Sequence, residues 1–163
     1  MQIDMKGRCA LITGGSRGMG LAIALKFAGA GADVAILARR ADVLEEARSE
    51  IEAAGGGKAV AHVCDVGDSA QLTDTFRAVS SDLGKVDILL NNAGSSVRGK
   101  LEDVTDEMWS SDLNLKLFGA IRLSRLAWPG MKERRWGRII NMSSIHGLVA
   151  SPYKSAYVSA KHG

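Results

Sequence analysis

Near the end of the 163-residue sequence, a serine, a tyrosine and a lysine have types and a spacing that suit proton transfer. Tyr157 and Lys161 are four residues apart, so on a helix they share one face. A free phenol has a pKa of about 10, and a neighbouring ammonium lowers it because the positive charge favours the phenolate. The hydroxyl of Ser144 could hydrogen-bond the same substrate oxygen. Because this Tyr–Lys spacing is also common by chance, its meaning depends on the motifs that accompany it.

A glycine-rich segment, Thr13-Gly14-Gly15-Ser16-Arg17-Gly18-Met19-Gly20, follows the first apolar run of the chain. Glycines at a strand-to-helix turn let the backbone approach a pyrophosphate, and the helix that follows offers N–H donors and the positive end of its dipole. The glycines at 14, 18 and 20 depart from the common GxGxxG spacing. The segment predicts a dinucleotide site, and the alternative is a tight turn without a ligand.

The residues after the second apolar run bear on the choice of dinucleotide. An acidic residue there would bind the ribose 2′-hydroxyl of NAD, whereas arginine accommodates the 2′-phosphate of NADP. Arg39 and Arg40 occupy that place, and Arg17 adds a positive group in the glycine loop. We therefore expect NADP(H) as the preferred cofactor. NAD(H) remains the alternative if Arg39 and Arg40 are solvated loop charges.

The elements that must position these residues alternate along the chain. Five apolar runs are expected as strands, at 9–12, 34–37, 59–63, 86–90 and 138–142. Runs that are apolar at consecutive positions suit strands covered on both faces. Because amphipathic stretches separate the runs, we expect an α/β fold with a doubly wound parallel sheet of Rossmann type.

Helices are expected between these strands. The first ends at Gly29, and the others cover about 42–54, 69–83 and 106–132, before a last helix that begins at Ser155. Asp42 and Asp68 have the spacing of capping residues for the second and third helices. Pro129 predicts a break in the fourth, because proline removes a helical hydrogen bond.

Composition and charge exclude several classes of protein. With 46% hydrophobic and 24% charged residues, intrinsic disorder is not expected. The apolar runs are too short for a membrane span, so we expect no membrane partner. Cys9 and Cys64 lack the spacing of metal ligands, which predicts buried reduced thiols and no metal site. The basic run at 132–138 could bind nucleic acid, but we expect a solvated face and no nucleic-acid partner.

The ordered motifs resemble those of the short-chain dehydrogenases/reductases: the glycine segment, Asn91-Asn92-Ala93-Gly94, Asn114, Ser144 and Tyr157-x-x-x-Lys161. The resemblance implies that Tyr157 is the general acid/base and that Lys161 lowers its pKa and holds the nicotinamide ribose. It implies that Ser144 orients the substrate oxygen and that Asn114 supports a water-linked proton relay. The cofactor is then expected at Gly14, Ser16, Arg17, Gly18, Met19, Gly20, Arg39, Asp65, Val66, Asn92, Ala93, Gly94, Tyr157 and Lys161.

A narrower resemblance, to the 3-hydroxybutyrate dehydrogenases, lies in the segments 144–151 and 154–158. It implies that His146 and Lys154 bind a substrate carboxylate, while Ser144 binds the substrate through its reacting oxygen; the alternatives are a neutral loop histidine and a solvated lysine. Two features depart from that group, which uses NAD and has a glutamine where this chain has Ser96.

We therefore expect an oxidoreductase that transfers a hydride between NADP(H) and a small-molecule substrate. The substrate is a carbonyl or secondary alcohol, such as a short oxo or hydroxy acid or a 3-oxoacyl compound. Because chains of this family normally continue, residues 1–163 are expected to form a C-terminally truncated dinucleotide-binding domain without its substrate region. The alternative is a non-catalytic nucleotide-binding fragment. The full-length form is expected to be a cytoplasmic homodimer or homotetramer.

Overall fold

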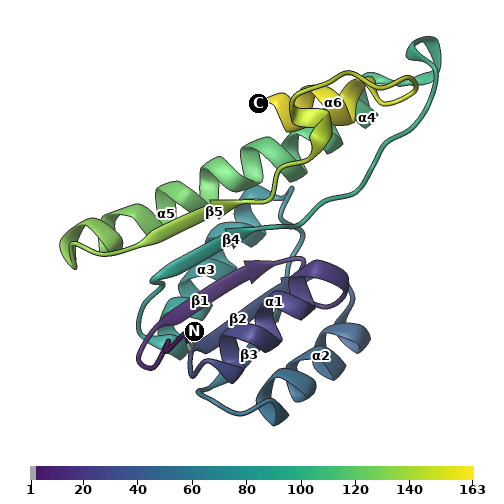
Figure 1. Cartoon of the computed structure of the whole chain (residues 1–163). Helices are drawn as coiled ribbons and strands as arrows, with labels where there is room; N and C mark the ends of the chain where they lie inside the picture. Colours follow the sequence, from purple (N-terminus) through teal and green to yellow (C-terminus); the bar gives the residue numbers. More distant parts are fainter. Residues whose placement is uncertain (1–2) are drawn as a thin grey trace.

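The backbone forms a five-stranded parallel sheet with helices on both faces, as a computed structural model of residues 3–163 shows (Figure 1). The strands are β1 (Cys9–Thr13), β2 (Asp33–Ala38), β3 (Ala59–Val63), β4 (Ile88–Asn91) and β5 (Arg138–Asn141). The helices are α1 (Gly18–Gly29), α2 (Ala41–Ala53), α3 (Ser69–Leu83), α4 (Asp106–Leu113), α5 (Gly119–Glu133) and α6 (Ser155–His162). Shorter turns are the 3-10 segments η1 (Leu101–Asp103) and η3 (Ile145–Gly147) and the π-helical turn η2 (Asn114–Phe118).

The strand order is β3-β2-β1-β4-β5, which confirms the doubly wound parallel sheet. The chain proceeds from β1 to one edge and then returns to β4 on the other side of β1. The carboxyl ends of β1 and β4 therefore meet where the winding direction reverses, which is where α/β sheets bind ligands. The glycine segment follows β1, and the segment Asn91–Gly94 overlaps the end of β4.

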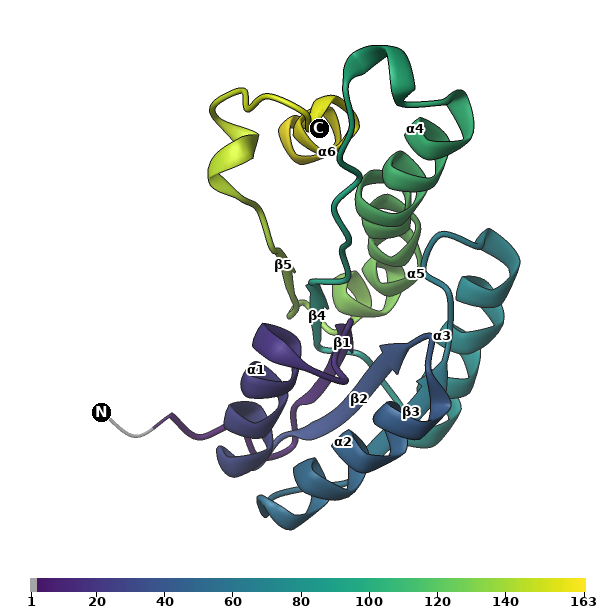
Figure 2. The same ribbon diagram turned by 90° about the vertical axis from the view of Figure 1, so that its right-hand side faces the viewer.

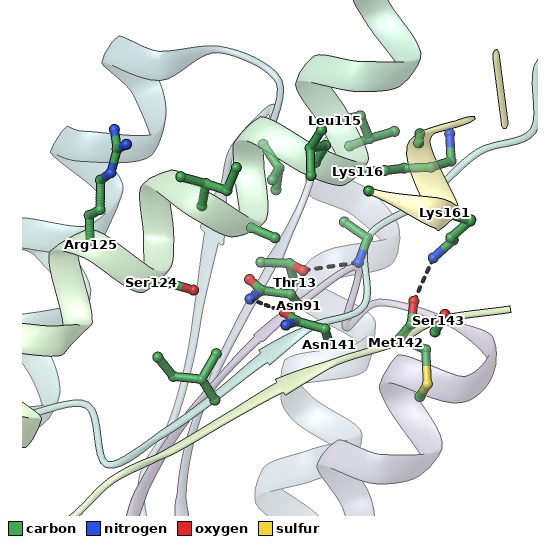
Figure 3. A pocket seen from close by; sticks show the side chains of 18 of the residues that line it. Thr13, Asn91, Leu115, Lys116, Ser124, Arg125, Asn141, Met142, Ser143 and Lys161 are labelled. Carbon is green, nitrogen blue, oxygen red and sulfur yellow. Dashed lines mark hydrogen bonds between the residues drawn. The ribbon is translucent and has the colours of Figure 1, made fainter. Parts of the chain in front are cut away.

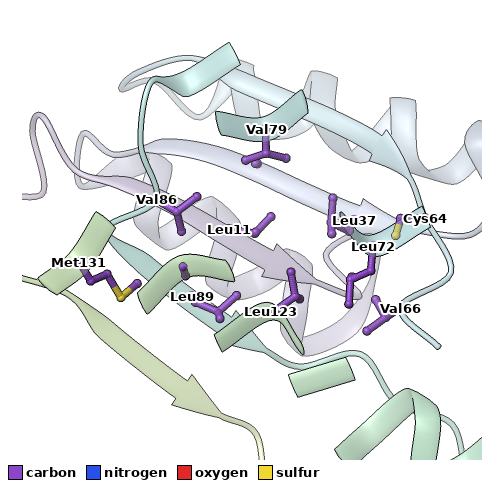
Figure 4. Packing of buried hydrophobic residues seen from close by; sticks show 12 residues of the cluster. Leu11, Leu37, Cys64, Val66, Leu72, Val79, Val86, Leu89, Leu123 and Met131 are labelled. Carbon is purple, nitrogen blue, oxygen red and sulfur yellow. The ribbon is translucent and has the colours of Figure 1, made fainter. Parts of the chain in front are cut away.

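Each face of the sheet has its own hydrophobic core, and neighbouring strand residues alternate between the two. Leu11 and Leu89 pack with α3 and α5, and Figure 4 shows this cluster. Ile12 and Leu90 pack on the opposite face with α1 and α2. Figure 2 shows the two helical layers on either side of the sheet. This alternation explains why the runs are apolar at every position rather than at every second one.

The strand β5 is less covered than the sequence pattern predicts. Ile140 is 41% exposed and Arg138 and Asn141 are also exposed. Among residues 3–163, β5 pairs with β4 alone, and its α1-side face has no covering helix (Figure 2). The expectation of strands buried on both faces is therefore wrong for β5, although its position and direction are as expected.

The helix ends differ in part from those predicted. Asp68 caps α3, since its carboxylate accepts hydrogen bonds from the backbone of Ala70 and Gln71 at 2.9 and 3.1 Å. Asp42 is not a cap, because α2 begins one residue earlier, at Ala41. Its carboxylate lies in the first turn, where it interacts favourably with the helix dipole.

The predicted break at Pro129 is also absent from α5, which continues to Glu133. Pro129 and Arg125, whose carbonyl loses its helical donor, both lie on the exposed side, where water can satisfy that oxygen. Ala127 and Met131 are buried against the sheet on either side of the proline. Their packing holds the last turns of the helix in line.

No helix among residues 3–163 combines the length and the apolar character that crossing a membrane requires.

Candidate active site

The turn after β1 has the backbone geometry of an anion site. Gly14 and Gly18 adopt positive φ angles of 66° and 56°, a region that favours glycine. The Gly14 amide donates to the Leu37 carbonyl at 2.7 Å, which fixes the turn against β2. The helix α1 begins at Gly18 without an acidic residue in its first turn, so its N-terminal amides face no competing carboxylate.

Gly20 packs so closely against this turn that a side chain has no room. A Cβ atom at position 20 would lie 2.2 Å from the Gly14 carbonyl oxygen and 2.7 Å from the Asn92 side-chain nitrogen. The glycine therefore lets α1 approach the loop that precedes it and the segment after β4.

Replacing Gly20 by alanine is expected to destabilise the protein and weaken NADPH binding. Overpacking of this kind costs about 1–3 kcal/mol in the free energy of unfolding. Urea denaturation and a fluorescence titration with NADPH measure the two effects. Gly29→Ala is the matched control on the same helix, because a Cβ there meets nothing within 4 Å. Equal effects of the two substitutions would contradict the close approach.

Thr13 joins the glycine turn to the segment after β4, a role that the sequence did not reveal. Its buried hydroxyl oxygen accepts hydrogen bonds from the amides of Asn92 and Ala93, each at 2.9 Å. The Asn92 side chain donates in return to the carbonyls of Thr13 and Gly14, at 3.0 and 3.2 Å. The two loops at the switch point are thus one hydrogen-bonded unit.

A cavity of about 400 Å³ lies over this unit. It is lined by every residue expected to hold the cofactor apart from Tyr157 and Lys161: Gly14, Ser16, Arg17, Gly18, Met19, Gly20, Arg39, Asp65, Val66, Asn92, Ala93 and Gly94. Leu37, Ala38, Arg40, Cys64 and Leu115 complete the lining. Of these, Arg40 was expected next to Arg39, whereas sequence motifs could not indicate the other four, because they enter the cavity only through the packing of the strands and η2.

Tyr157 lies on α6, which begins at Ser155 and packs against η3 and α4. The His146 ring meets the Tyr157 ring edge to face, with 5.9 Å between the ring centroids. The Lys154 ammonium is 3.0 Å from His146 Nε2 and 5.8 Å from the Tyr157 ring centroid. The structure therefore brings together the tyrosine and the two residues expected to bind a carboxylate.

Ser144 precedes η3, and its hydroxyl oxygen accepts the His146 amide at 3.2 Å. Lys161 follows Tyr157 by one turn of α6, and its ammonium donates to the Met142 carbonyl at the end of β5 (Figure 3). Burial lowers the pKa of Lys161 below its ordinary value, although the nearby Tyr157 opposes this shift. This hydrogen bond holds Lys161 at the carboxyl end of β5.

Asn114 lies at the start of η2, which packs against α6. Its side chain, however, contacts Arg122 rather than a residue of α6. Its amide oxygen accepts a hydrogen bond from Arg122 at 3.1 Å, and Arg122 also donates to the Gly67 carbonyl at 3.3 Å. The Asn114 carbonyl accepts the Gly119 amide, five residues on, which is the bonding of a π-helical turn. The side chain thus faces the Gly67 loop.

A second, larger cavity of about 670 Å³ opens between α5, β5 and the end of α6 (Figure 3). It shares Val66, Ala93 and Leu115 with the first cavity, and Lys161 also lines it. Tyr157 and Ser144 do not belong to its lining. The first cavity is not lined by Tyr157 or Ser144 either, so of these three residues only Lys161 lines either cavity.

The family assignment follows from comparison with known proteins. The model of the short chain dehydrogenase family matches residues 8–163. The chain belongs to the short-chain dehydrogenase family. The resemblance drawn from the glycine segment and the Ser144, Tyr157 and Lys161 pattern is therefore confirmed.

Individual members of this family show a narrower likeness. The chain is 44% identical over 160 residues to the D-beta-hydroxybutyrate dehydrogenase of Cupriavidus necator, an alignment that covers 98% of this chain and 61% of that protein. This confirms the expected similarity to 3-hydroxybutyrate dehydrogenases. The chain thus spans about three fifths of the length of this curated relative.

Among solved structures similar to this chain, one contains NADP and another contains NAD+. A metagenomic short-chain oxidoreductase in complex with NADP is 35% identical, with a TM-score of 0.90 over 96% of this chain and 70% of that chain. An NAD+-bound xylitol dehydrogenase is 30% identical, with a TM-score of 0.90 over 96% of this chain and 60% of that chain. The fold therefore accommodates either dinucleotide.

Proposed function

We propose that the whole protein is an NADP(H)-dependent oxidoreductase that interconverts a small carbonyl compound and a secondary alcohol, and that its substrate is a short oxo or hydroxy acid. The single observation that carries this proposal is the arrangement around Tyr157. The Tyr157 ring meets His146 edge to face and lies 5.8 Å from the Lys154 ammonium, and a separate glycine-lined cavity at the end of β1 suits the cofactor.

The cavity fits a dinucleotide on three grounds. The turn at Gly14 and Gly18 has backbone angles that favour glycine, and Gly20 leaves space that a Cβ would fill. The free N-terminus of α1 suits a pyrophosphate. Arg17 and Arg39 line the same cavity, which supports a preference for the additional phosphate of NADP(H). When bound, the cofactor supplies or accepts the hydride.

Tyr157 would act as the acid in reduction, because its phenol can give a proton to the substrate oxygen. Ser144 would orient the same oxygen. Its Oγ already accepts the His146 amide, so the hydroxyl proton remains free to donate. Lys161 would hold the nicotinamide ribose and favour the phenolate that remains after proton transfer. Asn114 is left out of this proton transfer, because its amide oxygen accepts a hydrogen bond from Arg122 and its carbonyl accepts the Gly119 amide.

Lys154 and His146 supply the site for a carboxylate. The ammonium of Lys154 donates to His146 Nε2, which implies a neutral ring with its proton on Nδ1. That Nδ1 is buried and has no hydrogen-bond partner among residues 3–163. A substrate carboxylate near Lys154 would pair with a charge that lies 5.8 Å from the reactive ring.

The substrate proposal predicts that short 3-oxo acids are turned over better than their neutral esters. The kcat/KM ratio of acid to ester is expected to fall by about tenfold or more in Lys154→Ala, since a charge-assisted contact contributes about 1.5–3 kcal/mol. Lys132→Ala, an exposed lysine at the far end of α5, is the control. A ratio near one in the parent protein would leave Lys154 as a solvated charge and favour a neutral carbonyl substrate.

The proposal includes a homodimer or homotetramer without nucleic-acid or membrane partners. Phe118 and Trp128, in η2 and α5, are 43% and 59% exposed, which supports a subunit contact there. Cys9 and Cys64 are buried free thiols, which supports a reducing compartment such as the cytoplasm. Burial raises the pKa of Cys9 to about 11, which keeps this thiol protonated.

A further inference from the structure

An ion pair between Asp112 and Lys116 is buried beside the proposed active site. Each side chain is only 1% exposed, and the Lys116 ammonium contacts Asp112 Oδ1. Asp112 Oδ2 is buried too, without a hydrogen-bond partner in the part of the chain that the structure describes. Removing two charges from water is unfavourable unless their mutual attraction offsets it. A buried pair of this kind is therefore weak evidence for stability and suggests another role.

The position of the pair indicates that role. Asp112 is at the end of α4 and Lys116 is in the π-helical turn η2, and both elements pack against α6. The Lys116 ammonium lies 5.2 Å from the centroid of the Tyr157 ring. In Figure 3 the Lys116 side chain extends toward α6, whereas Lys161 is directed at the Met142 carbonyl.

We propose that Lys116, held in place by Asp112, is a positioning residue that stabilises the phenolate form of Tyr157. This inference rests on the proposed function, because it concerns the same proton transfer. Lys116 acts through Tyr157 and is not itself required to touch the substrate.

Five titratable groups from four elements surround the Tyr157 ring: Lys161 on α6, Lys154 at its start, His146 in η3, Lys116 in η2 and, behind it, Asp112 in α4. They differ in how firmly their charge is held. Burial and the nearby Lys116 both lower the pKa of Lys161, whereas Asp112 and Tyr157 oppose that shift. Lys116 has a carboxylate in direct contact, so Asp112 fixes the position of its ammonium.

A purely structural role would give the pair a different signature. If the pair only tied α4 to η2, its neutralisation would change thermal stability and leave the proton affinity of Tyr157 as it was. If it stabilises the phenolate, its neutralisation must raise the pKa of Tyr157. Measuring the pKa of Tyr157 therefore distinguishes a structural role of the pair from stabilisation of the phenolate.

The chain allows this measurement directly because Tyr153 and Tyr157 are its only tyrosines. In a Tyr153→Phe background, the ultraviolet absorbance of tyrosinate against pH reports Tyr157 alone. We expect the Asp112→Asn/Lys116→Met double variant to raise the apparent pKa by about 1 unit, at the low end of shifts caused by an opposite charge because Asp112 already offsets part of it. Circular dichroism checks that each variant is folded.

Lys116→Met alone is the second variant, in case the double substitution does not fold. It removes the positive charge and leaves the Asp112 carboxylate, so the pKa of Tyr157 should again rise. Lys116→Arg should keep the parent value. The control is Arg48→Met/Glu52→Gln, which neutralises an exposed i,i+4 pair on α2. Folded variants whose Tyr157 titrates at the parent pH would overturn the proposal.

This titration requires neither turnover nor a known substrate. A protein that fails to oxidise NADPH but shows the shift would contradict the proposed function and leave the inference intact. A protein that oxidises NADPH but shows no shift in the pKa of Tyr157 would overturn the inference about Lys116 and leave the proposed function intact.

Discussion

Tyr157→Phe is expected to lower kcat for carbonyl reduction by at least ~10²-fold, the low end of general acid–base effects. The substitution removes the phenolic proton while the ring keeps its edge-to-face contact with His146 and its place beside Lys154. Because the cofactor cavity is formed by other elements, the Kd for NADPH should change little. Steady-state kinetics and a fluorescence titration measure the two quantities.

Tyr153→Phe is the matched control, since this second tyrosine is 64% exposed and has no lysine four residues later. It should retain parent turnover. Near-parent turnover in Tyr157→Phe would show that the proton comes from another group, and the role taken from the family resemblance would then be wrong for this chain.

Arg39→Asp is expected to reverse the preference between NADPH and NADH. A charge-assisted contact contributes about 1.5–3 kcal/mol, so losing it should weaken NADPH binding by about 10- to 150-fold. The aspartate would add repulsion of the 2′-phosphate and could accept a hydrogen bond from the 2′-hydroxyl of NADH. Dissociation constants of both cofactors, measured for parent and variant, give the result.

The control for this substitution is Arg77→Asp, on the exposed face of α3. This substitution changes the net charge of the protein by the same amount as Arg39→Asp, but Arg77 does not line the cofactor cavity. NADH binding by the parent protein that equals or exceeds NADPH binding would refute the assignment of Arg39.

The fold could be predicted from the sequence because its strongest signal is local. Residues such as Ile36 and Leu37 are both buried but on opposite faces, so the apolar run itself indicates a strand covered twice. The exposure of Ile140 could not be predicted in this way, because an apolar run indicates a strand but does not show what covers it.

Helix boundaries were less predictable because competing local choices differ by small energies. Asp42 and Asp68 have similar cap spacings, yet only Asp68 accepts the backbone amides of its helix. At Pro129, packing of Met131 against the sheet outweighs the local preference for a break.

The glycine and Tyr157–Lys161 motifs could indicate a candidate site from the sequence because each combines residue type with fixed spacing. Lys116 and Thr13 gave no such signal. The approach of Lys116 to Tyr157 depends on the π-helical turn and on the packing of η2 against α6, which only the three-dimensional structure shows. The same packing directs the Asn114 side chain to Arg122.

The most direct test of hydride transfer at this site uses NADPH that carries deuterium at both C4 positions of the dihydronicotinamide ring, mixed with a short 3-oxo acid and the protein. The product alcohol is analysed by mass spectrometry. We expect the alcohol to carry one deuterium and its yield to fall sharply in Tyr157→Phe. A protein that binds NADPH but forms no alcohol, or forms alcohol without the label, would contradict the proposed function.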